Sequence, residues 1–110
     1  MFARKKINKQ LYDAVQRNDV ETVTRLIKRG ADVNTRRGRL NRTVLIEACW
    51  NDNTEIVELL LRSGSDVNKT DDDGWTALHW AARSDHSEVV RILLENECDM
   101  NIKTNHSFSY

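Results

Sequence analysis

The feature that most constrains this chain is a short motif that recurs at a fixed interval. The motif reads GADVN at residues 30–34, GSDVN at residues 64–68 and, in a weaker form, ECDMN at residues 97–101. Its aspartate recurs after 34 residues and then after 33 residues. An interval of this length indicates a repeat protein, in which similar units stack against one another and bury a continuous core.

A second series of residues keeps the same interval and predicts what each unit contains. Leu11, Leu45 and Leu78 are spaced by 34 and 33 residues, and an alanine follows each of them three positions later. Residues three apart lie on one face of a helix, so this series predicts a packed helix in each unit. A second amphipathic segment follows, at DVETVTRLIKRG, NTEIVELLLRSG and HSEVVRILLENE. Each unit is therefore predicted to be a helix, a short turn, a second helix and an extended link.

Residues with strong conformational preferences mark the expected helix ends. Asp19 and Asn53 are predicted N-caps of the second helices, because their side chains can accept from free backbone N–H groups. Gly30 and Gly64 are predicted to end those helices in the left-handed conformation. Between the paired helices lie residues that also tolerate this conformation. They are Asn18, Asp52 and Asp85.

These motifs resemble ankyrin repeats: the period is that of the family, and GWTALHWAA at residues 74–82 is similar to its T-P-L-H-x-A signature. The resemblance covers about residues 8–110 and implies an all-α solenoid of about three helix-turn-helix units with short hairpin fingers. The units are expected at about 8–34, 35–68 and 69–101, within a single domain over 1–110. Residues 102–110 are expected to begin a truncated fourth unit or to form a C-terminal cap.

The resemblance also assigns roles within the signature. It implies that Thr76 opens a first helix, that the His79 imidazole bridges backbone groups of neighbouring units, and that Gly74 supplies a turn in the finger. Two departures stand out. Ala77 replaces the usual proline, and GRLNRT in the second unit lacks the glycine aligned with Gly74 and gains one residue.

The tryptophans do not fall on the leucine series, and two of them are therefore expected to be exposed. Trp75 lies near a fingertip and Trp50 on the solvent side of a first helix, where members of the family touch partners. Exposed tryptophan is a common binding hot spot, so we expect both to contact a partner. For Trp80, packing between adjacent units competes with a binding role.

Further candidate contacts follow from the same family positions on the fingers and first helices. The full predicted set is Arg36, Arg37, Arg39, Leu40, Arg42, Trp50, Asn51, Asp72, Asp73, Trp75, Trp80, Arg83 and Ser84. The predicted face is basic at one end, aromatic in the middle and acidic at the other, which suits a protein or peptide of mixed charge.

The net charge of zero conceals a gradient along the chain. Residues 1–42 carry 12 Lys or Arg against 4 Asp or Glu, whereas residues 43–110 carry 5 against 13, so the two parts have net charges of +8 and −8. Such a separation would orient a partner and would allow head-to-tail self-association. The alternative interpretation is an unevenly charged, solvated surface.

The sequence gives no sign of catalysis, of a metal site or of a cofactor. No Ser/His/Asp or Cys/His pair has a recognisable spacing, no glycine-rich phosphate loop is present, and the histidines are not grouped with Cys49 or Cys98 at zinc-ligand intervals. The triplet Asp71–Asp73 lacks the alternating ligands of a calcium loop. An enzyme is therefore not expected.

Two functional hypotheses remain. The first is a non-catalytic protein–protein interaction module that uses its concave face and fingers. The alternative is a nucleotide or oligonucleotide site in which tryptophan stacks on a base and arginines hold phosphates. Without a secretory signal or an apolar run of about 20 residues, we expect a cytoplasmic protein, with the nucleus as a second compartment and no membrane partner.

Overall fold

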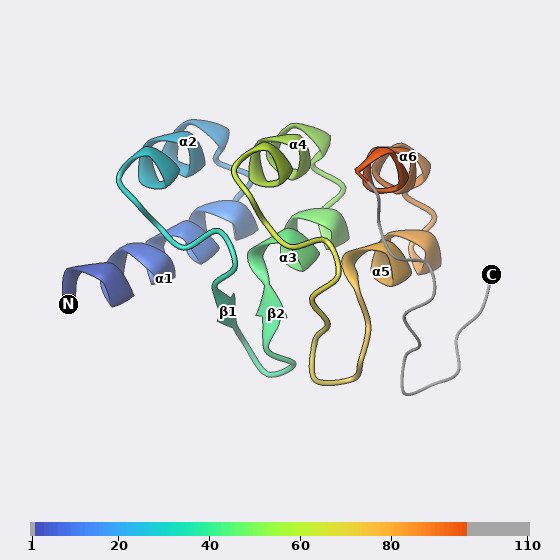
Figure 1. Cartoon of the computed structure of the whole chain (residues 1–110), viewed down its shortest axis with the longest axis horizontal. Helices are drawn as coiled ribbons and strands as arrows, with labels where there is room; N and C mark the ends of the chain where they lie inside the picture. The colour runs from blue at the N-terminus through green and yellow to red at the C-terminus, as the bar shows by residue number, and fades with distance from the viewer. Residues whose placement is uncertain (1, 97–110) are drawn as a thin grey trace.

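The computed structural model describes residues 2–96, and these form helix pairs that repeat along one axis (Figure 1). The first helices of the pairs are α1 (Phe2–Gln16), α3 (Val44–Trp50) and α5 (Ala77–Arg83). The second helices are α2 (Val20–Lys28), α4 (Thr54–Arg62) and α6 (Ser87–Glu95). Figure 1 shows the first helices in one row and the second helices in another. The predicted all-α solenoid of helix-turn-helix units is confirmed.

The predicted helix ends are confirmed by the backbone. Asp19 accepts a hydrogen bond from the Thr22 N–H, and Asn53 accepts one from the Ile56 N–H, as N-caps do. The left-handed conformation is adopted at both predicted glycines and at all three predicted turn residues. Their φ angles are 96° at Gly30, 100° at Gly64, 59° at Asn18, 56° at Asp52 and 60° at Asp85.

The core follows the leucine series. Leu11, Leu45 and Leu78 are at most 2% exposed. The alanines three positions later are fully buried, which lets neighbouring first helices approach closely. The apolar faces of the second helices join the same cluster. Each helix pair therefore depends on its neighbour to complete its core, as in other stacked repeats.

The recurrent GADVN motif makes hydrogen bonds that join consecutive units. Within the motif, the Asp32 carboxylate accepts from the Asn34 N–H at 2.8 Å, which closes a tight turn. The Asn34 side chain then accepts from the Asp66 N–H of the next unit at 2.7 Å. Asn8 does the same for Asp32, also at 2.7 Å. The copy at residues 30–34 therefore helps to position the copy at residues 64–68.

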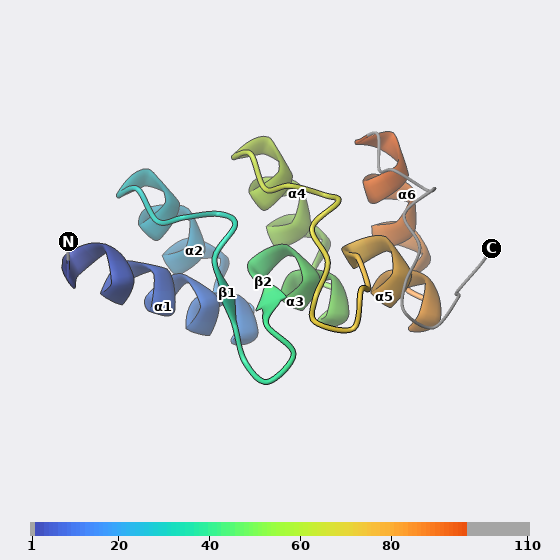
Figure 2. The ribbon, with the colours of Figure 1, turned by 60° about the horizontal axis from the view of Figure 1, so that its bottom comes forward.

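The fingers extend from the edge of the first helices (Figure 2). In the second-unit finger (residues 35–43), β1 (Arg36–Arg37) pairs antiparallel with β2 (Arg42–Thr43), with Arg36 opposite Thr43. The third-unit finger comprises residues 69–76. Within residues 2–96, no helix is long and apolar enough to cross a membrane. The weaker motif copy at 97–101 and the predicted fourth unit or cap at 102–110 lie outside the described residues.

Candidate partner-binding face

The second-unit finger is tied to the third-unit finger by hydrogen bonds to the backbone. Asn41, aligned with Gly74, adopts the left-handed conformation with φ 55°, so asparagine replaces the missing glycine of this finger. The Arg36 guanidinium donates to the Thr70 carbonyl at 2.6 Å and to the Asn41 carbonyl at 3.3 Å. The Asp72 N–H donates to the Leu40 carbonyl at 2.9 Å. The two fingers therefore stand side by side.

The third-unit finger is organised around the buried carboxylate of Asp71. Its Oδ1 accepts from the backbone N–H groups of Asp73 at 2.9 Å and Trp75 at 3.0 Å. Its Oδ2 accepts from the Trp80 indole N–H at 2.7 Å. Asp71 is 4% exposed, so these bonds largely replace its hydration. Among the described residues, no group of three or more His, Cys, Asp or Glu could hold a metal ion.

The expectation that Trp75 is exposed is wrong. Its side chain is only 6% exposed, because the finger turns back at Gly74 (φ 82°) and lays the indole over the first helix. The ring lies 4.9 Å from the Trp80 ring and 6.1 Å from the His79 ring, measured between centroids. The Arg83 guanidinium lies 5.5 Å from the Trp75 centroid. Trp75 thus packs the finger onto α5, and its burial removes the argument for a hot spot.

Trp50, by contrast, is 43% exposed at the end of α3. Its ring meets the Trp80 ring edge-on, with centroids 5.1 Å apart and planes at 88°. The Arg42 guanidinium lies 5.1 Å from the Trp50 centroid and 4.7 Å from the Trp80 centroid. Trp80 therefore packs between adjacent units, whereas Trp50 presents an indole that is held in place but still open to solvent.

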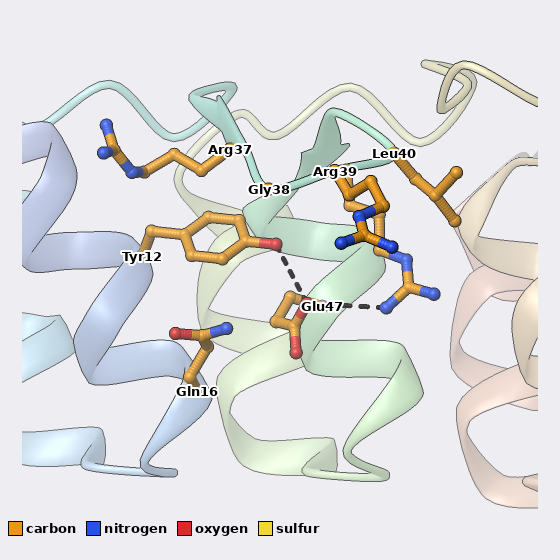
Figure 3. Close-up of a pocket in the computed structure, with 8 residues that line it drawn as sticks. Tyr12, Gln16, Arg37, Gly38, Arg39, Leu40 and Glu47 are labelled. Carbon is orange, nitrogen blue, oxygen red and sulfur yellow. Dashed lines mark hydrogen bonds and ion pairs between the residues drawn. The ribbon is translucent and has the colours of Figure 1, made fainter.

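A cavity of about 340 Å³ lies between α1 and the second-unit finger (Figure 3). At its base, the Tyr12 hydroxyl donates to Glu47 Oε1 at 2.9 Å, and Arg42 Nη1 lies 3.8 Å from the same oxygen. Burial, together with the charge of Glu47, raises the pKa of Tyr12 well above its usual range. The remaining lining residues are Gln16, Arg37, Gly38, Arg39 and Leu40.

The Thr76–His79 pair is part of the helix start. The Thr76 hydroxyl accepts from the His79 N–H, while His79 Nδ1 accepts from the Thr76 N–H at 3.1 Å, so the two form a capping box. The prediction that Thr76 opens the helix is confirmed. Burial lowers the pKa of His79 below its ordinary value, in keeping with a neutral ring whose Nδ1 accepts.

The other predicted contact residues divide by what their side chains do. Arg36 is bonded to finger carbonyls, and the Asn51 amide donates to the Val15 carbonyl of the preceding unit at 3.3 Å. Both contribute to the stacking of units, and a binding role for either stays a prediction. The exposed members are Arg37, Arg39, Asp72 and Arg83, and the half-exposed ones are Leu40, Asp73 and Ser84.

Three residues of this region were missed by reasoning from the sequence. Tyr12 and Glu47 meet only in the folded chain, although a glutamate inside the apolar run VLIEAC signals a buried carboxylate that needs partners. In the sequence, Asp71 stands out only as part of an acidic triplet. Its signal was weaker: an aspartate four residues before a fingertip tryptophan can accept from the intervening backbone N–H groups.

Stacked helix pairs that share one core and carry projecting fingers define a solenoid repeat protein. A family model for ankyrin repeats, in three copies, matches residues 11–104, and the chain belongs to the ankyrin-repeat family. Ankyrin repeats generally mediate protein–protein interaction, and domains of this kind are typically non-catalytic.

Curated relatives are much longer than this chain. Bovine (Bos taurus) mitochondrial disaggregase is 35% identical over 100 residues, which cover 91% of this chain and 14% of that protein. Human (Homo sapiens) inversin is 32% identical over 83 residues, 76% of this chain and 8% of that protein. The potassium channel AKT1 of Oryza sativa subsp. indica is 41% identical over 63 residues, 57% of this chain and 7% of the channel. The similarity therefore concerns the repeats alone.

Proposed function

We propose that this chain is a non-catalytic module that binds a partner protein or peptide through the concave face formed by the first helices and the fingers. The observation that carries the proposal is the exposed indole of Trp50. An indole in water carries an unfavourable hydration cost that a partner's surface would remove. Tryptophan also contributes to binding hot spots more often than most residues.

The charges on the two fingers support a partner of mixed charge. Arg37 and Arg39 lie exposed on the second-unit finger, and Asp72 and Asp73 lie on the third-unit finger beside it. Opposite charges on adjacent fingers set a direction along the face. A partner that places acidic groups over the arginines and basic groups over the aspartates would bind in one orientation only.

A matched pair of variants tests the proposed face. Leu94 on α6 is 43% exposed, the same fraction as Trp50, but it lies on a second helix. We expect Trp50→Ala to weaken partner binding by about 30-fold or more, the effect of losing a hot-spot residue worth about 2 kcal/mol. Leu94→Ala should change binding by less than about twofold.

The measurement is capture of cellular proteins by the immobilised full chain, followed by titration of each captured protein against the three forms. Circular dichroism of each form checks that the helices are intact. Capture that is equal for the wild type and for Trp50→Ala would contradict the proposed face. Equal losses in both variants would point to a general effect on folding or solubility and would also count against it.

Of the two tryptophans expected to be exposed, only Trp50 is left to stack on a base in the alternative of a nucleotide or oligonucleotide ligand, because Trp75 is buried. Trp50 and the arginines of the second-unit finger would have to supply the whole site. Titration with single-stranded oligonucleotides and with nucleotides at low ionic strength tests this hypothesis. Quenching of tryptophan emission that disappears in Trp50→Phe would favour it over a protein partner.

A further inference from the structure

We propose that the cavity between α1 and the second-unit finger receives the carboxylate of an aspartate or glutamate side chain presented by the partner. This inference rests on the proposed function and names the chemistry that one part of the face recognises. The cavity holds about 340 Å³ and is lined by three arginines and a single acidic residue (Figure 3).

The first argument is the unmet hydrogen-bonding capacity of Arg42. Its side chain is 21% exposed, and among the described residues its guanidinium makes no hydrogen bond. The ion pair with Glu47 spans 3.8 Å, longer than the 2.7–3.2 Å of an N–H···O bond. Its Nε is covered by protein and has no acceptor in the described part of the chain. The covered Nε cannot be reached from solvent, so a carboxylate in the cavity would bind the other guanidinium nitrogens, which make no hydrogen bond and are not among the covered atoms.

The second argument is the imbalance of charge. Glu47 is already matched by the Tyr12 hydroxyl and by Arg42. Arg37 and Arg39 are exposed at the cavity, and neither forms an ion pair with any described residue. The cavity therefore presents two cations that nothing in residues 2–96 neutralises. The guanidinium group binds carboxylates in a bidentate manner, which gives direction as well as strength.

The surroundings favour a single carboxylate over a polyanion. The third-unit finger, with Asp72 and Asp73, lies directly beside the cavity, since the Asp72 N–H donates to the Leu40 carbonyl. A chain of phosphates that passed over the arginines would meet these aspartates. An isolated acidic side chain would not, and a polypeptide can place a basic residue next to it.

The chain offers an internal control for nonspecific attraction of anions. A larger cavity of about 510 Å³ on α2 is lined by Glu21, Thr24, Arg25, Lys28 and Arg29. It also has three cations and one acidic residue, so its formal charge is the same. It lacks a covered arginine nitrogen without an acceptor, because Arg42 Nε is the one such atom in the described residues. A site that depends on charge alone would not distinguish the two cavities.

The test uses the ¹⁵N-labelled full chain and the side-chain Nε–Hε signals of its arginines, with Arg42→Lys to assign the Arg42 signal. The probes are the capped tripeptides acetyl-Gly-Glu-Gly-amide and acetyl-Gly-Gln-Gly-amide, and inorganic phosphate. We expect the Glu peptide to shift the Arg42 signal in a saturable manner. The Gln peptide should bind at least about tenfold more weakly than the Glu peptide. Phosphate should bind no more tightly than the Glu peptide.

Paired charge variants complete the test. Arg37→Gln with Arg39→Gln should weaken Glu-peptide binding at least about tenfold, whereas Arg25→Gln with Arg29→Gln should change it less than about twofold. Equal binding of the Glu and Gln peptides, equal effects of the two variants, or tighter binding of phosphate would overturn the inference.

The outcomes for the carboxylate and for the binding face can be told apart. If Trp50→Ala abolishes partner capture but the Glu peptide leaves the Arg42 signal unchanged, only the carboxylate site is rejected. If the Glu peptide binds as expected but Trp50→Ala captures partners like the wild type, the proposed hot spot is rejected instead.

Discussion

Replacing Asp71 with alanine should loosen the third-unit finger and expose two tryptophans. The Asp71 carboxylate is 4% exposed and accepts hydrogen bonds from two backbone N–H groups and from the Trp80 indole. Alanine removes all three acceptors at once. The Trp80 N–H is partly buried, so water can replace only some of what is lost.

The size of the effect follows from these bonds. A hydrogen bond to a charged group contributes about 1.5–3 kcal/mol, and the finger can relax to let water reach the two backbone donors. We therefore expect Asp71→Ala to lower the free energy of unfolding by about 3–5 kcal/mol, out of about 5–15 kcal/mol for a domain. Asp71→Asn should lower the free energy of unfolding by less than Asp71→Ala, because its amide oxygen can still accept from the backbone N–H groups. It should still be destabilising, because the amide NH₂ group would face the Trp80 indole N–H, and both are donors.

The assay is urea unfolding followed by circular dichroism, together with tryptophan emission of the folded state. Asp66→Ala is the matched control, because the exposed Asp66 carboxylate accepts only from the Asn68 N–H, at 2.9 Å, among the bonds of the described residues. It should cost about 1 kcal/mol or less. An Asp71→Ala variant within about 1 kcal/mol of the wild type, with unshifted emission, would refute the role given to this carboxylate.

Further predictions concern the core, the capping box and the cavity. Leu78→Ala should lower the free energy of unfolding by about 2–5 kcal/mol in urea, because Leu78 is 2% exposed, whereas Leu94→Ala should change it by about 0.5 kcal/mol at most. Because burial lowers the pKa of His79, protonation disfavours the folded state, so stability should fall as the pH drops through about 6.5 towards the folded-state pKa. His79→Gln keeps an acceptor for the capping box and should flatten this dependence in urea unfolding at several pH values. Tyr12→Phe removes the hydroxyl that donates to buried Glu47 and should cost about 1–3 kcal/mol, measured in the same way.

The parts of the fold that could be predicted are those set by local chemistry. The leucine series predicted the core because helical periodicity decides which side chains face the neighbouring unit. Caps such as Asp19 and turn residues such as Asn18 could be predicted because each depends only on a hydrogen bond or a backbone conformation set by residues close to it in the chain. Repetition strengthened these predictions, since the same type of cap or turn residue occurs at the equivalent position of more than one unit.

The candidate site was harder to predict because it depends on contacts between units. Trp50 and Trp75 both fall off the leucine series, yet one is 43% and the other 6% exposed. The difference arises from Asp71, which closes the third-unit finger and holds Trp80 where Trp75 can cover it. The cavity likewise joins Tyr12 to Glu47, which is 35 residues away in the chain.

Near Arg42, an apolar ring that is already held in place lies beside a guanidinium group that lacks hydrogen-bond acceptors. The Trp50 ring rests against Trp80 and Arg42, so a partner need not pay the full entropy of fixing it. The Arg42 guanidinium, in contact with both rings, has no hydrogen bond among the described residues. The free energy of binding is most favourable where the apolar side chain is already rigid in the free protein and the polar groups next to it have no hydrogen-bond partners within the protein. If Arg42 served only to support the rings, Arg42→Met would leave binding of the Glu peptide unchanged, whereas a carboxylate site requires Arg42→Met to weaken that binding.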